Sequence, residues 1–125
     1  MGAIKSHRDL VVWQKSMLLA GMAYDIPKKM PKTGQYGLTG QMLRAAVSIP
    51  ANIAEGNARN TRKDYARFIS IARGSTAELD TLLLLAVQTK VLKFEIVSPA
   101  LDLADEIGRM LTALHQKLDP DPIPT

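Results

Sequence analysis

The two histidines and the acidic side chains are the residues best suited to acid–base or metal chemistry, and their spacing argues against both. His7 stands in the N-terminal arm and His115 late in the last predicted helix. Di-iron bundles need Glu-x-x-His pairs on two helices, but neither Glu55 nor Glu78 has a histidine three residues later. The absence of cysteine excludes a thiolate nucleophile or a cysteine-based zinc site. The sequence therefore predicts no catalytic residue, no metal and no cofactor, and it carries no glycine-rich phosphate-loop or dinucleotide signature.

Basic side chains gather where the second and third predicted helices meet. They are Arg59, Arg62, Lys63 and Arg67, with Arg44 and Arg73 as extensions if the helix faces coincide. Arginine suits phosphate because its planar guanidinium group makes paired contacts. The cluster of Arg44, Arg59, Arg62, Lys63 and Arg67 predicts a surface that binds nucleic acid. A solvated helix end and a contact for an acidic protein partner are the alternatives.

A second polar stripe lies beside the apolar face of the second predicted helix. Its members, Gln41, Arg44, Ser48, Asn52, Glu55 and Arg59, fall within an arc of roughly 80° at helical spacing. In the third predicted helix Ser75 and Glu78 are one turn apart. We consider a structural polar network of Ser48, Asn52, Glu55, Ser75 and Glu78 that fixes helix register or joins subunits. The alternatives are an ordinary boundary stripe and a catalytic or metal role, the last being the least favoured.

The elements that must position these residues are four helices with short connections. Apolar residues recur at spacings of three and four over about 9–29, 37–59, 62–90 and 98–118. Pro27, Pro31 and Gly34 end the first helix, and Pro50 lies inside the second. Asp9, Thr61 and Ser98 are the expected N-caps, with Pro99 at the first position of the last helix. The pattern predicts one all-α domain over 1–125, an antiparallel up-down-up-down four-helix bundle with a disordered tail at 119–125.

The inward faces are predicted from the same periodicity. The expected core stripe of the first helix is Leu10, Trp13, Met17, Ala20 and Tyr24. The second contributes Leu38, Met42, Ala45, Ile49, Ile53 and Gly56, and the third Tyr65, Phe68, Ala72, Ser75, Leu79, Leu82 and Ala86. The fourth contributes Leu101, Ala104, Ile107, Leu111, Leu114 and Leu118. The run Leu82–Leu85 covers nearly the whole helix circumference, so the sequence predicts burial on more than one side and hence self-association.

Composition sets the remaining bounds. The 125 residues carry a net charge of +4, unevenly divided. Residues 1–75 hold twelve basic and four acidic side chains, and residues 76–125 hold four and eight. This asymmetry is compatible with an anionic partner, with head-to-tail self-association, or with an ordinary mixed-charge surface. Neither a signal peptide nor a membrane-spanning run is expected, which favours the cytoplasm and no membrane partner.

Three segments carry a resemblance to a known family. They are HRDLVVWQK at 7–15, LTGQMLRAAVSIPANIAEGNAR at 38–59 and KDYARFISIARGSTAELDT at 63–81. Together they resemble the four-helix-bundle proteins named after the intervening sequence of bacterial 23S ribosomal RNA genes, over about residues 7–118. The string from Ser48 to Gly56 is the most specific part. The resemblance marks Asn52, Glu55, Gly56, Ser75 and Glu78, and it adds Arg44, Arg59, Arg62, Lys63 and Arg67 as a basic surface of the family's kind.

What the resemblance implies is an interaction protein. The family is similar in fold to the accessory variability protein of diversity-generating retroelements, a homopentameric barrel with a basic surface that binds a reverse transcriptase and nucleic acid. We therefore expect a non-enzymatic homo-oligomer, in the form of a pentameric ring, with weak affinity for RNA, DNA or a nucleic-acid-handling protein. The alternative is a purely structural or protein-binding adaptor. An enzyme on a bundle scaffold is the least favoured hypothesis.

Overall fold

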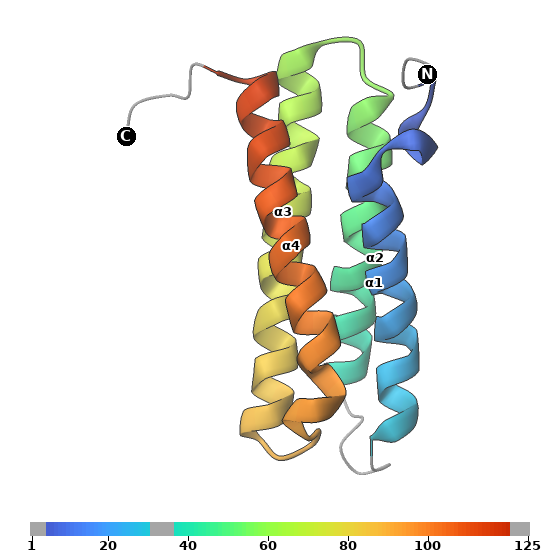
Figure 1. Cartoon of the computed structure of the whole chain (residues 1–125), viewed down its shortest axis with the longest axis vertical. Helices are drawn as coiled ribbons and strands as arrows, with labels where there is room; N and C mark the ends of the chain where they lie inside the picture. The colour runs from blue at the N-terminus through green and yellow to red at the C-terminus, as the bar shows by residue number, and fades with distance from the viewer. Residues whose placement is uncertain (1–4, 31–36, 121–125) are drawn as a thin grey trace.

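The computed structural model describes residues 5–30 and 37–120. Within these ranges the chain forms α-helices, two short 3-10 helices and no strand (Figure 1). The elements are η1 His7–Asp9, α1 Val11–Asp25, η2 Ile26–Lys29, α2 Leu38–Asn57, α3 Arg62–Gln88 and α4 Phe94–Leu118. The all-α prediction with four α-helices is confirmed for this part of the chain. The predicted tail lies outside the described residues from position 121 onward.

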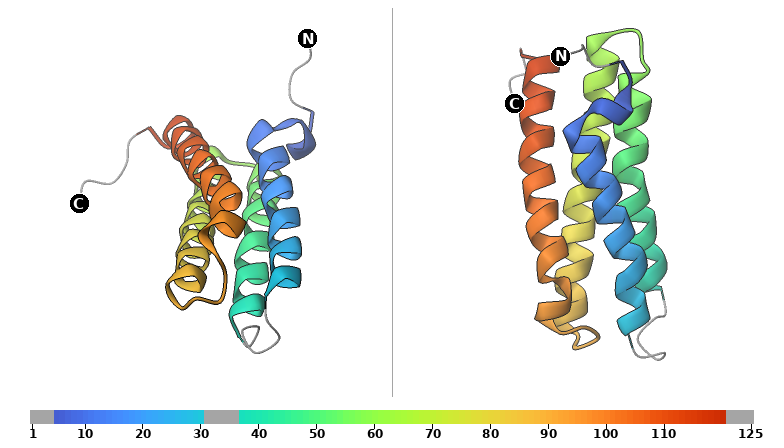
Figure 2. Two further views of the ribbon diagram at one scale, coloured as in Figure 1. Left: turned by 60° about the horizontal axis from the view of Figure 1, so that its bottom comes forward. Right: turned by 45° about the vertical axis from the view of Figure 1, so that its right-hand side comes forward.

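The four helices pack side by side, and each end of the bundle gathers several segments (Figures 1 and 2). The start of α1, the end of α2, the start of α3 and the end of α4 meet at what we call the upper end, after its place in Figure 1. The end of α1, the start of α2 and the α3–α4 turn form the lower end. α2 and α4 each contact both α1 and α3. Every helix therefore has two neighbours and one outward face.

The core follows the inward stripes that periodicity predicts for α2, α3 and α4. Large side chains with no exposed surface include Leu19, Met42, Ile49, Ile53, Ile69, Leu79, Leu83, Ile107 and Leu111. Burying one aliphatic side chain of this size contributes about 1.5–3 kcal/mol, so this layer is the main source of stability. No helix in the described ranges is long and apolar enough to cross a membrane.

The inward face of α1 differs from the prediction. Met17 and Tyr24 are 48% and 58% exposed, whereas Val12, Leu19 and Ala23 are buried. The buried stripe of α1 is therefore displaced by about one residue from the predicted stripe. The reason is that α1 is apolar on most of its circumference, so the spacing of its apolar residues permits more than one inward face. The predicted Asp9 cap is also wrong. Ser6 caps η1 in a capping box with Asp9, and α1 begins one residue after Leu10.

α4 begins four residues earlier than predicted, at Phe94, so Ser98 is not its cap. Pro99 lies inside the first turns of α4, where its missing N–H costs one bond to the carbonyl of Glu95. The preceding turn is closed by Lys90, whose φ of 64° is left-handed. The backbone N–H groups of Val91 and Leu92 both donate to the carbonyl of Ala86, at 2.9 and 3.1 Å. This pattern is the usual end of a helix and holds the turn in one conformation.

Candidate nucleic-acid interface

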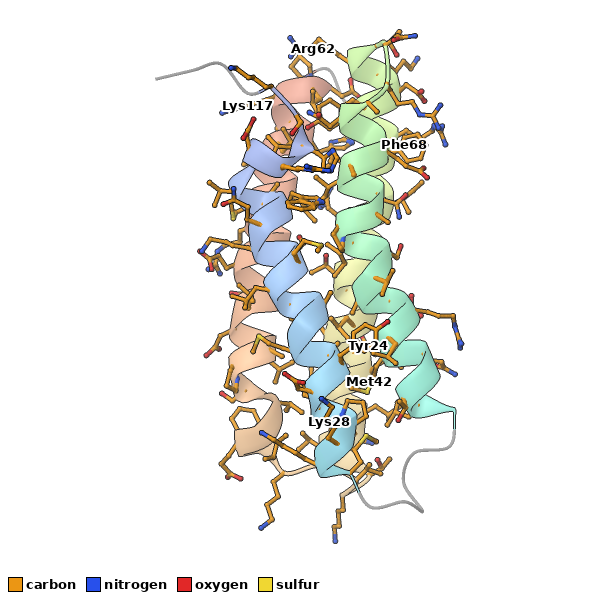
Figure 3. The ribbon with its side chains drawn as sticks, turned by 90° about the vertical axis from the view of Figure 1, so that its right-hand side faces the viewer. Tyr24, Lys28, Met42, Arg62, Phe68 and Lys117 are labelled. Carbon is orange, nitrogen blue, oxygen red and sulfur yellow. The ribbon has the colours of Figure 1, made fainter. Side chains whose placement is uncertain are left out.

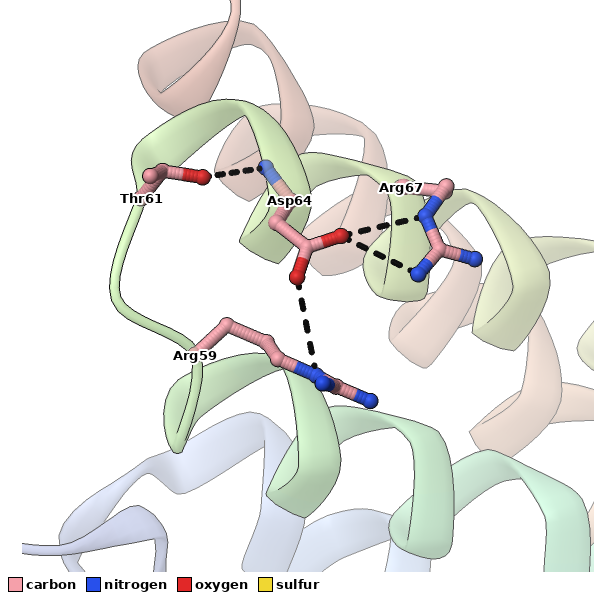
Figure 4. Close-up of polar contacts among 4 residues, drawn as sticks. All are labelled: Arg59, Thr61, Asp64 and Arg67. Atoms are coloured by element: carbon pink, nitrogen blue, oxygen red, sulfur yellow. Dashed lines mark hydrogen bonds and ion pairs between the residues drawn. The ribbon is translucent and has the colours of Figure 1, made fainter.

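The α2–α3 junction at the upper end is organised around Asp64. The N–H of Asp64 donates to the hydroxyl of Thr61 at 3.1 Å, which confirms Thr61 as the cap of α3 (Figure 4). The carboxylate of Asp64 accepts two bonds from Arg67, at 3.1 and 3.0 Å, and lies 3.6 Å from Nε of Arg59. This carboxylate therefore joins two of the predicted basic residues, Arg59 just after α2 and Arg67 in α3.

Both guanidinium groups also stack on one aromatic ring. The guanidinium carbons of Arg59 and Arg67 each lie 4.5 Å from the centroid of the Phe68 ring. Phe68 is itself buried at 6% exposure. Cation–π contacts of this kind contribute about 0.5–1 kcal/mol each at exposed sites. The ring and the carboxylate therefore fix the orientation of the two arginines, while 45% and 61% of their side-chain surface stays open to solvent.

Gly56 permits the two helices to approach at this point. A Cβ atom on Gly56 would lie 2.9 Å from both Cβ of Phe68 and Cδ1 of Tyr65, closer than real contacts allow. The side-chain amide of Asn57 donates to the hydroxyl of Tyr65 at 3.3 Å beside it. The glycine at the end of the most family-like segment thus has a packing role. It places the end of α2 directly against the start of α3, where the basic residues stand.

Arg62 and Lys63 extend the upper end toward α4. The guanidinium group of Arg62 donates to the backbone carbonyl of Lys117, near the end of α4, and Figure 3 labels both residues at this end of the bundle. The C-terminus of a helix carries partial negative charge, so the contact suits arginine. Lys63 is exposed and lines a surface hollow of about 510 Å³ between α3 and α4. The same hollow includes His115 and Asp119.

The fold adds basic residues that the sequence pattern did not associate with this site. Lys5 lies just before η1, Arg8 lies within η1, and Lys117 lies in the last turn of α4. All three therefore lie at the upper end. All three are exposed. The signal that identifies them lies in the fold, because η1, the start of α1 and the end of α4 lie at the same end of the bundle as the α2–α3 junction (Figure 1).

Arg44 is not part of this surface. It precedes Asn57, the last residue of α2, by thirteen residues, which is about 20 Å along a helix axis at 1.5 Å per residue. A Cβ atom on Gly40 would lie 3.2 Å from Nη1 of Arg44, so the guanidinium group folds back along α2 toward the lower end. The predicted residues that lie on the upper surface are therefore Arg59, Arg62, Lys63 and Arg67. The fold adds Lys5, Arg8 and Lys117 to them.

Three members of the predicted polar network come together and two do not. The hydroxyl oxygens of Ser48 and Ser75 lie 2.7 Å apart and share a hydrogen bond between α2 and α3. The amide of Asn52 donates to the carbonyl and the hydroxyl of Ser48, at 2.8 and 2.9 Å. Glu55 and Glu78 are exposed. The three inner residues can fix the register of α2 against α3, whereas the two glutamates face solvent.

Among the described residues, no group of three or more histidine, cysteine or acidic side chains is placed to hold a metal ion. Buried polar side-chain atoms in this part of the chain all have hydrogen-bond partners. The cations that this part of the chain orients by stacking and ion pairing lie at the upper end.

The fold and the upper end define a class: an all-helical bundle whose basic surface lies at the junction of its second and third helices. The model of the 23S rRNA-intervening sequence protein family matches residues 8–113. The chain belongs to that family, and the resemblance found in the sequence is confirmed.

A solved structure gives the same fold. The chain is similar to a crystal structure from Bacteroides thetaiotaomicron, described as a protein with unknown function from the S23 ribosomal protein family. The two share 25% sequence identity with a TM-score of 0.77, over 85% of this chain and 99% of the other. A search of curated proteins finds no match. The comparisons therefore establish the family and the fold, and the function has to be argued from the residues.

Proposed function

We propose that this chain is a non-enzymatic, homo-oligomeric interaction module, built on an antiparallel bundle, that binds nucleic acid weakly through the upper end. The observation that carries the proposal is the set of exposed cations at one end of the fold. Arg62 and Lys63 begin α3, close in the chain to the stacked pair Arg59 and Arg67, and Arg62 bonds to the carbonyl of Lys117 in the last turn of α4. Contacts from such groups reach phosphate oxygens rather than base edges, so binding is expected to be independent of sequence.

Charge at the upper end is moderated by acidic side chains, which supports weak rather than tight binding. Asp64 is shared by two arginines, and Asp119 lines the same hollow as Lys63. A surface with few free cations makes few phosphate contacts, and nonspecific binding then has a Kd of about 10⁻⁴–10⁻⁶ M at physiological salt. Repetition of the surface in an oligomer would raise the avidity.

Self-association is supported by the outward face of α1. Val11, Met17, Leu18 and Tyr24 are 53%, 48%, 61% and 58% exposed. Apart from Asp25 at its last position, α1 carries one charged residue, Lys15. The ammonium group of Lys15 pairs with Glu106 at 2.8 Å. A helix face that is apolar and carries no unpaired charge is typical of protein–protein contacts. A pentameric ring is the form that the family resemblance implies.

Binding is tested with a duplex of about 20 base pairs and a salt titration, since each lost phosphate contact lowers the log–log salt slope by about 0.9. Arg62→Glu with Lys63→Glu should weaken binding at least about tenfold and reduce the slope by about 2. Arg44→Glu with Lys28→Glu is the matched control, because it changes the net charge equally and both residues lie toward the lower end. No binding by wild type at low salt, or equal losses in both double variants, would favour the protein-binding adaptor instead.

Assembly is tested by light scattering at micromolar concentration. Wild type should have a mass several times the 13.7 kDa of one chain, and Leu18→Glu should lower it because a buried, unpaired charge is costly at an interface. Val47→Glu is the matched control, since Val47 is a similarly exposed aliphatic residue, at 45%, on α2 and outside the Leu82–Leu85 run. A monomeric wild type contradicts the assembly, and a loss of mass only in the Val47 variant would move the interface to α2.

A further inference from the structure

The lower end of the bundle contains a second basic hollow, which has no part in the proposed function. It has a volume of about 980 Å³ and lies around the α3–α4 turn and the end of η2. Its charged lining consists of Lys29, Lys90 and Lys93 against the single carboxylate of Glu95. Its apolar lining includes Val87, Val91 and Phe94. The hollow therefore combines a cationic rim with an apolar wall, and its size is that of a ligand site.

The turn that carries two of these lysines is held in place by its backbone. Lys90 occupies the left-handed position that closes α3, and the two residues after it both bond to the carbonyl of Ala86. Leu92, between the two lysines, is buried at 5% exposure and anchors the turn in the core. The backbone of Lys90 and Lys93 is thus held in place by the turn, while their side chains are exposed.

Phe94 gives this hollow a feature that the upper end lacks. Its side chain is 52% exposed, although it begins α4 directly beside Lys93. The other phenylalanine of the chain, Phe68, is buried, and two arginines stack on its ring. An exposed aromatic ring among cations is the combination on which single-stranded nucleic acids bind, because an unpaired base can stack on the ring while its phosphates meet the ammonium groups.

The two ends are separate binding surfaces. α3 runs from one end to the other, and its 27 residues span about 40 Å at 1.5 Å per residue. The stretch between the ends carries Glu78, Asp80, Asp102, Asp105 and Glu106 against Lys15, Arg73 and Arg109. Charges farther apart than a Debye length of about 8–10 Å are largely screened from each other. A strand held at the lower end is therefore not drawn along the bundle to the upper end.

We propose that the lower hollow binds single-stranded nucleic acid, with one base stacked on Phe94 and the neighbouring phosphates on Lys29, Lys90 and Lys93. A duplex does not fit this mode, because its bases are stacked on each other and offer only their edges. The inference goes beyond the proposed function, since it concerns another surface and another form of nucleic acid. The chain would then hold a duplex at one end and a single strand at the other.

The test uses the full-length protein and a fluorescein-labelled oligothymidine of about 12 nucleotides, a length within the range of single-strand sites. Stacking of one base on an aromatic ring is lost on truncation, so Phe94→Ala should weaken binding about tenfold in fluorescence anisotropy. Phe94→Leu keeps an apolar side chain of similar bulk and should lose as much, whereas Phe94→Trp should bind at least as well as wild type. The indole fluorescence of Phe94→Trp should also be quenched by the oligonucleotide beyond any change in wild type. Wild-type affinity in both the alanine and the leucine variant would overturn the proposal.

The lysines are tested separately. Lys90→Glu with Lys93→Glu should reduce the salt slope for the oligonucleotide by about 1.4, at about 0.7 per single-strand phosphate. In the Phe94→Trp background, Arg62→Glu with Lys63→Glu should leave the quenching of the indole by the oligonucleotide unchanged, whereas Lys90→Glu with Lys93→Glu should remove it, because only the lower lysines hold the strand beside residue 94. If the upper variant loses both ligands and the lower variants lose neither, the upper end alone binds and this inference is wrong. If inorganic polyphosphate displaces the oligonucleotide equally from wild type and Phe94→Leu with no stacking signal, the site is an unselective cationic surface and the inference is also wrong.

Discussion

The two ends of the bundle use basic residues in opposite ways. At the upper end the cations contact the protein itself: Arg59 and Arg67 share Asp64 and the Phe68 ring, and Arg62 bonds to the carbonyl of Lys117. At the lower end Lys29, Lys90 and Lys93 line one hollow together with the exposed ring of Phe94. The number of basic residues in a segment is therefore a poor measure of how many are free to meet phosphate. A better measure is how many of these basic side chains already pair with carboxylates, carbonyls or rings of the protein itself.

The two phenylalanines provide the sharpest contrast between the ends. Phe68 is 6% exposed and Phe94 is 52% exposed. Phe68→Ala should lower the free energy of unfolding by about 3–4 kcal/mol, because it removes a packed ring and leaves a cavity under two arginines. Phe94→Ala should lower it by about 1 kcal/mol or less, since most of that surface is already in water. Urea unfolding of both variants measures the difference. Equal losses would mean that both rings are structural and would remove the basis for a stacking site.

The approach of α2 and α3 gives the next largest effect. Gly56→Ala should destabilise the fold by about 1–3 kcal/mol, because the added methyl group would overlap Phe68 and Tyr65 and neither can move without shifting a helix. Gly74 is the matched control: it lies in α3, and a Cβ atom there would meet no atom within 4 Å. Gly74→Ala should raise stability by about 0.4–1 kcal/mol through helix propensity and chain entropy. Thermal unfolding shifts of opposite sign would support the close approach, and a neutral Gly56→Ala would refute it.

The contrast also shows how far the sequence alone reaches. The inward faces of α2, α3 and α4 were predicted, because each has apolar residues at helical spacing with polar ones opposite. The face of α1 was not, because a helix that is apolar nearly all round gives no preferred direction, and Met17 and Tyr24 were placed inside. Ser98 and Pro99 make a strong local signal for a helix start, but α4 begins at Phe94. Tertiary packing of Leu92 and Val97, both buried, outweighs that signal.

The candidate site was partly predictable for the same reason. Residues close in the chain, such as Arg62 and Lys63, fall together whatever the fold. The sequence also groups Arg44 with them, but Arg44 lies thirteen residues before the end of α2, and a shared helix face does not shorten that distance. The lower hollow joins Lys29 of η2 to one stretch of chain, Val87 to Ile96, that ends α3 and begins α4. Lys90, Lys93 and Phe94 are close in the chain, but only the fold brings Lys29 to the same hollow.

Asp64 permits a final test of the upper end, with the smallest expected effect. Asp64→Asn removes the charge shared by Arg59 and Arg67 but keeps the shape of the side chain. The loss of stability should be about 0.5–1 kcal/mol, because exposed ion pairs and an acid in the first turn of a helix each contribute little. Duplex binding should become about two- to fivefold tighter, because two guanidinium groups would gain freedom to meet phosphate, each adding up to about 0.9 to the salt slope. Oligothymidine binding at the lower end should not change. If Asp64→Asn instead weakens duplex binding, the carboxylate acts by orienting the arginines for phosphate, and the upper end is a pre-arranged site whose cations are already available.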